Sequence, residues 1–167
     1  PNKRANSGSY EDYITLKNTA KKRNVRFIYE TNVGAGLPVI NSLQDLMCSG
    51  DKILKIEAVL SGTLSYIFNN FKGNKKFYDV VKKAKELGYT EPDPRDDLNG
   101  LDFARKLLIL AREAGFMLEL KDVSVENILP ESCIAAKTVD EFFTELGRNE
   151  AFFEQKKKNA EAKGKTL

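Results

Sequence analysis

The spacing of apolar residues predicts a chain built mainly from helices. Apolar residues recur three or four positions apart along several stretches, which is the period of an amphipathic helix. The predicted helices are opened by Ser9 with Asp12, by Pro38, by Ser61–Thr63, by Phe77, by Leu101 and by Thr138 with Glu141. The helix from Leu101 to Ala114 is apolar around most of its circumference, so we expect it to be largely buried. A charged, helix-prone tail begins at Asn149.

Other stretches follow the two-residue period of a β-strand. Apolar side chains alternate along residues 25–30 and again along residues 53–60, which predicts a strand in each place. Residues 122–129 predict a short strand or an extended connection. Because the predicted strands precede helices, the fold class is a mixture of α and β.

Length and composition fit one ordinary globular domain. The chain has 167 residues, of which 41% are apolar and 31% charged, so it can build a core of its own. Its net charge is only +3, which argues against a dedicated nucleic-acid binder. No apolar run reaches the roughly 18 residues of a membrane span, so we expect no membrane partner. The chain begins with Pro1 rather than Met, and we interpret it as a piece of a longer polypeptide.

The residue types present restrict the chemistry that the chain can perform. Histidine is absent, which excludes His-based triads and HExxH zinc sites and leaves acid–base work to Lys, Asp, Glu, Tyr or Cys. Cys48 and Cys133 are too few for a disulfide framework. They are typical of buried thiols in a reducing compartment, here taken as the cytoplasm.

A glycine-rich turn, Gly34-Ala35-Gly36, lies where a dinucleotide fingerprint would lie, between a predicted strand and a helix. The fingerprint needs a third small residue at the position of Val39, so the match fails. Two interpretations stay open. The glycines allow a tight turn with positive φ, or the turn carbonyls and the nearby Glu30 bind a hard cation weakly.

The acidic segment from Glu91 to Asp102 is the most unusual part of the sequence. An EF-hand alignment would put Arg95 and Lys106 at ligand positions, which excludes calcium binding of that kind. A solvated acidic loop that caps the next helix is one interpretation, and a carboxylate metal hydrolase site is another. Asp102 and Lys106 are four residues apart on one helix face. They form either an ordinary ion pair or, in a cleft, a lysine proton donor held by a carboxylate. Glu91 and Asp102 together would attract the ammonium group of a small cationic or zwitterionic substrate.

Several long motifs resemble one family. The strings TNVGAGLPVI, LSGTLSYIFN, GYTEPDPRDDLNGLDFARKL and ILARE are similar to homoserine dehydrogenase, most of all to the form fused to an aspartate kinase. The resemblance extends from Pro1 to about Pro130 and continues more weakly beyond. It implies reduction of L-aspartate 4-semialdehyde to L-homoserine with NADP or NAD as cofactor, on the route to threonine, methionine and isoleucine.

The resemblance also implies a role for particular residues. Lys106 matches the catalytic lysine. The implied substrate-binding residues are Glu91, Asp102, Thr63 and Tyr89, with Glu91 and Asp102 holding the amino group of the amino-acid substrate. Lys3 matches a lysine between cofactor and substrate, and Gly88 lies on the nicotinamide side. The implied site for a monovalent cation such as sodium consists of Glu30 and the carbonyls of Val33, Ala35 and Leu37.

For the fold, the resemblance implies an α+β domain with helices packed on one face of a mixed β-sheet whose other face forms a homodimer. Residues 1–167 would be the substrate-binding and dimerisation domain of a longer chain, helix-rich and possibly truncated. The family's N-terminal nucleotide-binding domain has no counterpart in these residues. The alternative hypothesis is that the chain by itself is a catalytically silent structural or dimerisation fragment of the enzyme.

Overall fold

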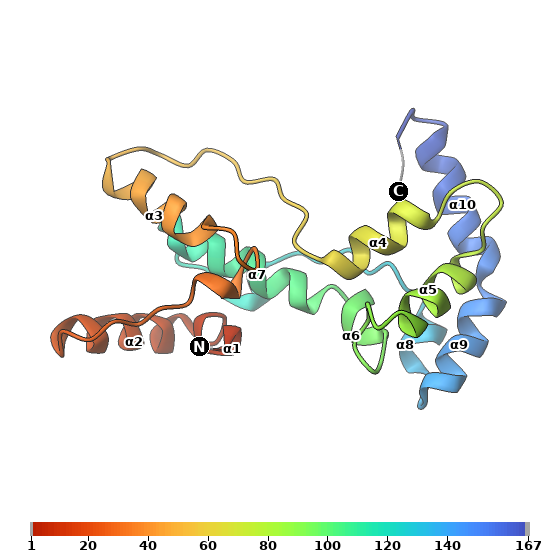
Figure 1. Cartoon of the computed structure of the whole chain (residues 1–167), viewed down its shortest axis with the longest axis horizontal. Helices are drawn as coiled ribbons and strands as arrows, with labels where there is room; N and C mark the ends of the chain where they lie inside the picture. The colour runs from red at the N-terminus through yellow and green to blue at the C-terminus, as the bar shows by residue number, and fades with distance from the viewer. Residues whose placement is uncertain (1, 166–167) are drawn as a thin grey trace. The chain divides into compact units, whose positions relative to one another are not determined.

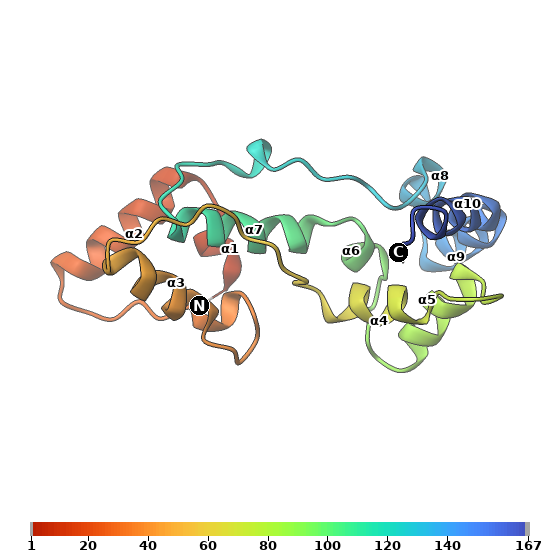
Figure 2. The ribbon, with the colours of Figure 1, turned by 90° about the horizontal axis from the view of Figure 1, so that it is seen from above.

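The computed structural model describes residues 2–165, and the regular structure in that part of the chain is entirely helical. The chain divides into two compact units, which are described separately. The first unit consists of Pro1–Leu60 and Leu101–Val125, and the second of Ser61–Gly100 and Glu126–Leu167. Figures 1 and 2 show the order of the helices along the chain by colour.

The first unit is organised around one long helix. Its elements are α1 (Lys3–Asn6), α2 (Tyr10–Lys22), the 3-10 turn η1 (Glu30–Asn32), α3 (Val39–Cys48), α7 (Leu101–Glu113) and the 3-10 turn η2 (Leu120–Asp122). The α7 residues Ile109 and Leu110 are buried in a core with Ile40 and Leu43 of α3. Both α1 and α3 pack against α7, so α7 is the scaffold of this unit.

The second unit has an aromatic core. Its elements are α4 (Gly62–Asn70), α5 (Phe77–Glu86), α6 (Arg95–Leu98), α8 (Glu131–Ala135), α9 (Val139–Arg148) and α10 (Glu150–Glu161). Phe77 of α5 stacks on Phe153 of α10 with ring centroids 4.0 Å apart. Phe142 and Leu146 of α9 are fully buried in the same cluster. Phe153 therefore makes the start of the charged tail part of the core.

The helix starts follow from local sequence signals. Ser9 accepts a hydrogen bond from the amide of Asp12 at the start of α2, and Thr138 accepts one from Glu141 at the start of α9. Both capping boxes predicted from the sequence are thus confirmed at their N-cap bond. The predicted helix from Leu101 to Ala114 is observed as α7, and α6 and α8 are short helices that the sequence pattern did not predict.

The predicted strands are wrong. Residues 25–29 and 53–60 have no regular secondary structure, residue 30 begins η1, and within the described residues no backbone hydrogen bond joins one segment to the other. Val25 and Ile28 are exposed, and the side chain of Leu54 is almost fully so, at 94%. A two-residue period prepares a segment for pairing, but a strand forms only where a second edge satisfies its N–H and C=O groups. The expected mixed sheet with helices on one face is therefore not observed.

The two cysteines differ from each other. Cys133 is fully buried, and burial raises the pKa of its thiol. Cys48 is exposed at the end of α3, so the prediction of two buried thiols is wrong for Cys48. Among the helices of residues 2–165, none combines the length and the apolar character that crossing a bilayer requires.

Candidate functional site

The first turns of α7 hold a carboxylate and an ammonium group against each other. Lys106 Nζ lies 2.7 Å from Asp102 Oδ2, as their four-residue separation on one helix face predicts. Lys106 also donates to the backbone carbonyl of Leu60 at 2.7 Å. Its side chain is 18% exposed, so the ammonium group lies at the protein surface but is largely enclosed by its acceptors.

A second lysine reaches the same carboxylate from α1. Lys3 Nζ donates to Asp102 Oδ1, so Asp102 stands between two ammonium groups. Burial acts to raise the pKa of Asp102, but the hydrogen bonds and charges of Lys106 and Lys3 together hold it below the usual range. Asp102 is therefore ionised at neutral pH and keeps a charged partner beside each lysine.

This arrangement is suited to proton donation. An ammonium group has three N–H donors, and Lys106 uses two of them on Asp102 and Leu60. A substrate oxygen could accept from the third. An adjacent carboxylate favours the charged, proton-carrying form of a lysine. The geometry is also that of an ordinary ion pair, so the chemistry has to be tested by its effect on a reaction.

Thr63, Gly88, Tyr89 and Glu91 belong to the second unit. Thr63 Oγ1 donates to the carbonyl of Tyr89 at 2.6 Å, which ties the start of α4 to the segment after α5. The Tyr89 ring lies against Tyr66 with centroids 4.8 Å apart. Gly88 has φ +72 and ends α5. Thr63, Gly88 and Tyr89 thus form one local group.

Glu91 is held through its backbone. Its amide donates to Asp97 Oδ2 at 2.8 Å, and Asp93 is bound by the Arg95 side chain, whose hydrogen bonds hold the pKa of Asp93 below its usual range. Two of the acidic loop's carboxylates are thus engaged within the loop. No group of three or more His, Cys, Asp or Glu in the described part of the chain is arranged to hold a metal ion. Lys3, Asp102 and Lys106 are brought together in the first unit, whereas Glu91 belongs to the second.

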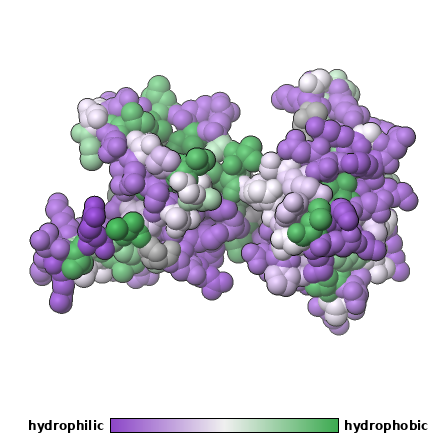
Figure 3. Space-filling model, in the orientation of Figure 1, coloured by the Kyte–Doolittle hydropathy of each residue, from purple (hydrophilic) through white to green (hydrophobic). Residues whose placement is uncertain are grey.

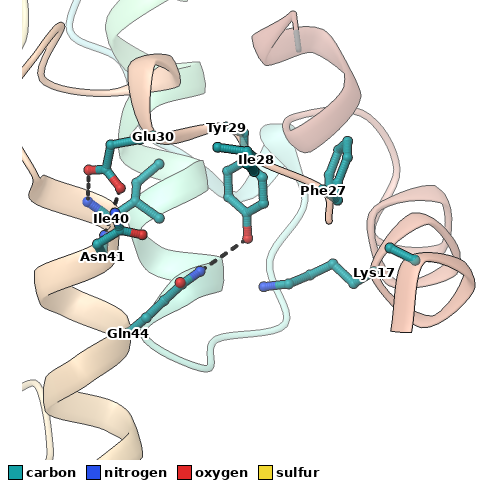
Figure 4. A pocket seen from close by; sticks show the side chains of 9 residues that line it. Lys17, Phe27, Ile28, Tyr29, Glu30, Ile40, Asn41 and Gln44 are labelled. Carbon is teal, nitrogen blue, oxygen red and sulfur yellow. Dashed lines mark hydrogen bonds between the residues drawn. The ribbon is translucent and has the colours of Figure 1, made fainter. Parts of the chain in front are cut away.

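The turn predicted as a cation site has a different observed role. Both oxygens of the Glu30 carboxylate accept backbone amides of α3, from Ile40 at 2.8 Å and from Asn41 at 2.9 Å (Figure 4). The carbonyl of Leu37 accepts the amide of Val39. Glu30 therefore caps α3, satisfying donors that the first turn of any helix leaves open.

Sequence reasoning missed a buried polar network on α7. The side chain of Glu113 is 2% exposed. Its carboxylate accepts from Tyr13 at 2.7 Å, from Tyr29 at 2.8 Å and from Gln44 at 2.7 Å, and Lys17 lies 3.0 Å away. Figure 4 shows Lys17, Tyr29 and Gln44 converging from separate elements around a cavity of about 270 Å³. The signal in the sequence was a charged pair, Arg112 and Glu113, that follows the apolar run Leu107–Ala111 at the end of the helix.

The network changes the titration of its members. Gln44, Tyr13 and Lys17 hold the pKa of Glu113 below its usual range against the opposing effect of burial. Burial and the neighbouring Glu113 charge raise the pKa of both Tyr13 and Tyr29 well above that of a free phenol. Each group is thus kept in the state that it has at neutral pH.

Comparison with known families assigns the chain. The family model described as homoserine dehydrogenase matches residues 38–167, which is most of the chain. The chain belongs to the homoserine dehydrogenase family. This confirms the resemblance that its motifs indicated.

The chain spans less than half the length of the homoserine dehydrogenase relatives that it matches. It is 49% identical over 167 residues to a chloroplastic bifunctional aspartokinase/homoserine dehydrogenase of Zea mays, covering 100% of this chain and 18% of the relative. It is 44% identical over 173 residues to a homoserine dehydrogenase of Schizosaccharomyces pombe, covering 100% of this chain and 46% of that one. A crystal structure of a Candida auris protein of unknown function superimposes with a TM-score of 0.90 at 45% identity, over 98% of this chain and 47% of that chain.

Proposed function

We propose that this chain is the substrate-binding part of an NAD(P)-dependent homoserine dehydrogenase, which reduces L-aspartate 4-semialdehyde to L-homoserine. The observation that carries the proposal is the placement of Lys106 between Asp102 and the carbonyl of Leu60, in a chain of this family. Reduction of an aldehyde to an alcohol requires one proton at the carbonyl oxygen. Lys106 donates that proton, and Asp102 keeps the lysine charged and oriented.

The remaining site residues bind and orient the amino acid. Glu91 and Asp102 supply negative charge for its ammonium group, and Thr63 and Tyr89 line the pocket around its side chain. These roles rest on the family motifs SGT, GYTEP and GLDFARKL, which contain Thr63, Tyr89 with Glu91, and Asp102 in turn. The bond between Thr63 and Tyr89 supports a shared role, because it holds the two residues together within one unit.

The hydride for this reduction would come from a nicotinamide cofactor. The residues of this chain do not fit a complete dinucleotide site, because Val39 replaces the third small residue of the fingerprint. We propose that Lys3 and Gly88 each contact the cofactor. We also propose a monovalent cation, with the carbonyl oxygens of Val33 and Ala35 as its ligands. Glu30 and the carbonyl of Leu37 already accept hydrogen bonds from backbone amides.

The proposed assembly is a homodimer, with a fused aspartate kinase as a further possibility that the bifunctional relatives suggest. The exposed apolar side chains along residues 53–60 support an interface. The second candidate function follows from the same observation: on its own, the chain would be a silent dimerisation fragment. The two candidates differ in whether Lys106 matters to a reaction.

A chimaera tests the proposal. This chain replaces the matching segment of the Schizosaccharomyces pombe homoserine dehydrogenase, to which it is 44% identical. We expect the chimaera to reduce the aldehyde, and Lys106→Met to lower kcat by roughly 10²–10⁴-fold. The matched control is Lys83→Met, which removes a lysine from a pair with Glu86 that is 60% exposed on the lysine side and lies outside the proposed site and interface.

The control should keep the activity of the parent chimaera. A folded, cooperatively melting chimaera without activity would contradict the proposal. Equal activity of Lys106→Met and Lys83→Met would instead assign Lys106 to an ordinary ion pair.

A further inference from the structure

The helix that carries Lys3 is too short to be stable without contacts to the rest of the chain. α1 consists of four residues, Lys3–Asn6, and an isolated helix of that length has no stability in water. Yet Lys3 meets Asp102, which lies 99 positions further along the chain. Contacts outside α1 must therefore fix its place.

The strongest of these contacts comes from Arg112 on α7. Its side chain is fully buried, at 0% exposed. Its guanidinium donates to the carbonyls of Asn6 and Gly8, both at 2.9 Å, and to that of Leu118 at 2.8 Å. Carbonyls 6 and 8 belong to the chain that leaves α1, so the planar fork of Arg112 fastens this chain to α7.

Ser7 makes a second connection between α1 and α7. Its hydroxyl donates to the backbone carbonyl of Lys3 at 2.9 Å and accepts from Arg105 Nη1 at 3.1 Å. Ser7 is 2% exposed, so these bonds are protected from water. The bond to Lys3 acts directly on the residue that reaches Asp102.

We propose that Ser7, Arg105 and Arg112, which we name the α1 clamp, are positioning residues that hold Lys3 against the carboxylate of Asp102. The significance of the α1 clamp for catalysis rests on the proposed function, but its action on Lys3 does not. Ser7 and Arg112 bond to backbone carbonyls of α1 and the residues after it, and Arg105 bonds to the Ser7 hydroxyl. The hydrogen bonds of these three residues go to groups other than Asp102 and Lys106.

The consequence can be measured at Asp102. Two charged groups face this carboxylate, Lys3 from α1 and Lys106 from α7 itself. Releasing α1 leaves Lys106 as its remaining cation, so the pKa of Asp102 rises toward the ordinary carboxyl value. Loss of a structural bond elsewhere would lower stability without this rise.

A double-mutant cycle read by carbon NMR titration of the Asp102 carboxyl group tests the proposal. The variants are Lys3→Met, Arg112→Lys and the two combined, in the active chimaera. We expect Arg112→Lys to raise the pKa of Asp102 as Lys3→Met does, and the double variant to add nothing beyond Lys3→Met. Ser7→Ala is the milder second variant. It removes one hydroxyl and should give a smaller rise in the same direction.

Lys157→Met is the matched control. Lys157 is a buried cation that donates to the carbonyl of Gly73 in the second unit, so its loss should lower stability and leave Asp102 unchanged. The proposal is overturned if Ser7→Ala and any folded Arg112→Lys leave the pKa of Asp102 at its parent value, or if the effects of Arg112→Lys and Lys3→Met add. A pKa response without any change in kcat would still uphold the α1 clamp, whereas the proposed function is tested separately by Lys106→Met.

Discussion

The carboxylate of Glu113 accepts the hydroxyl of Tyr13 at 2.7 Å inside the first unit, joining α7 to α2 across 100 positions of the chain. Tyr29 and Gln44 bring two more segments to the same carboxylate. This one side chain therefore determines how α2, α3 and the segment before η1 gather around α7.

Neutralising Glu113 should destabilise the first unit. Glu113→Gln removes the buried charge that accepts hydrogen bonds from Tyr13 and Tyr29 and pairs with Lys17. We therefore expect a loss of about 2–4 kcal/mol in the free energy of unfolding. Urea denaturation measures the change. Glu86→Gln is the control, because Glu86 belongs to an exposed pair with Lys83 and should change stability by less than about 0.5 kcal/mol. Equal effects of the two changes would show that the network carries no stability.

The same network predicts how stability depends on pH. Because the pKa of Glu113 is lower in the folded state, its contribution is complete above the unfolded value of 4.5 and is lost as the pH falls through the depressed folded value. The stability difference between the parent chain and Glu113→Gln should thus be constant near neutral pH and shrink in acid. Urea unfolding at a series of pH values checks this, and a difference that grows in acid would contradict it.

Tyr13 and Tyr29 predict that the network also loses stability at alkaline pH. Their pKa values are raised in the folded state, so their contribution is complete below the unfolded value of 10.0 and is lost as the pH rises above it. Ultraviolet titration should show two of the six tyrosines ionising only when the chain unfolds. Normal titration of all six would contradict the buried network.

Gly34 should not tolerate a side chain. It has φ +84, and a Cβ atom there would lie 2.5 Å from Val39 Cγ2. We expect Gly34→Ala to cost about 1–3 kcal/mol of stability. Gly36→Ala is the matched control in the same turn, because a Cβ atom at Gly36 meets nothing within 4 Å. Thermal melts of the two variants should differ clearly, and coinciding melts would show that the turn can rearrange.

A substitution at Glu30 distinguishes a helix-capping role from a cation-binding role. Glu30→Gln removes the charge that faces the start of α3, so the melting temperature should fall by an amount worth about 1 kcal/mol. If a cation also binds there, replacing a bulky organic cation by sodium should raise the melting temperature of the parent chain but not of the variant. If sodium changes the melting temperature of neither the parent chain nor Glu30→Gln, Glu30 caps α3 and binds no cation.

Local signals predicted the helices well. Ser9 and Thr138 identified two helix starts because an N-cap bond needs only residues three positions apart. For the same reason, the pair of Asp102 and Lys106 could be predicted from spacing on one helix. The strands at 25–30 and 53–60 could not be decided locally, because pairing depends on an edge supplied from elsewhere.

The site shows the same division between local and distant contacts. The bond of Lys3 to Asp102 and the bond of Lys106 to Leu60 join distant positions, and no periodic pattern encodes them. The resemblance to the family brought Lys3 into the candidate site but did not predict its acceptor. Glu113 and Arg112 were overlooked because they stand in a helix whose apolar residues dominate its pattern.

The extended segment 51–60 is a hazard for solubility. Leu54 and Val59 are 94% and 81% exposed, and a β-prone apolar run outside regular secondary structure is a template for cross-β aggregation. Figure 3 shows hydrophobic surface on the first unit. Lys52, Lys55 and Glu57 interrupt the run as gatekeepers. Ile53, Ile56 and Leu60 pack against the core of the first unit, and the charges oppose fibril assembly through the apolar side chains that stay exposed.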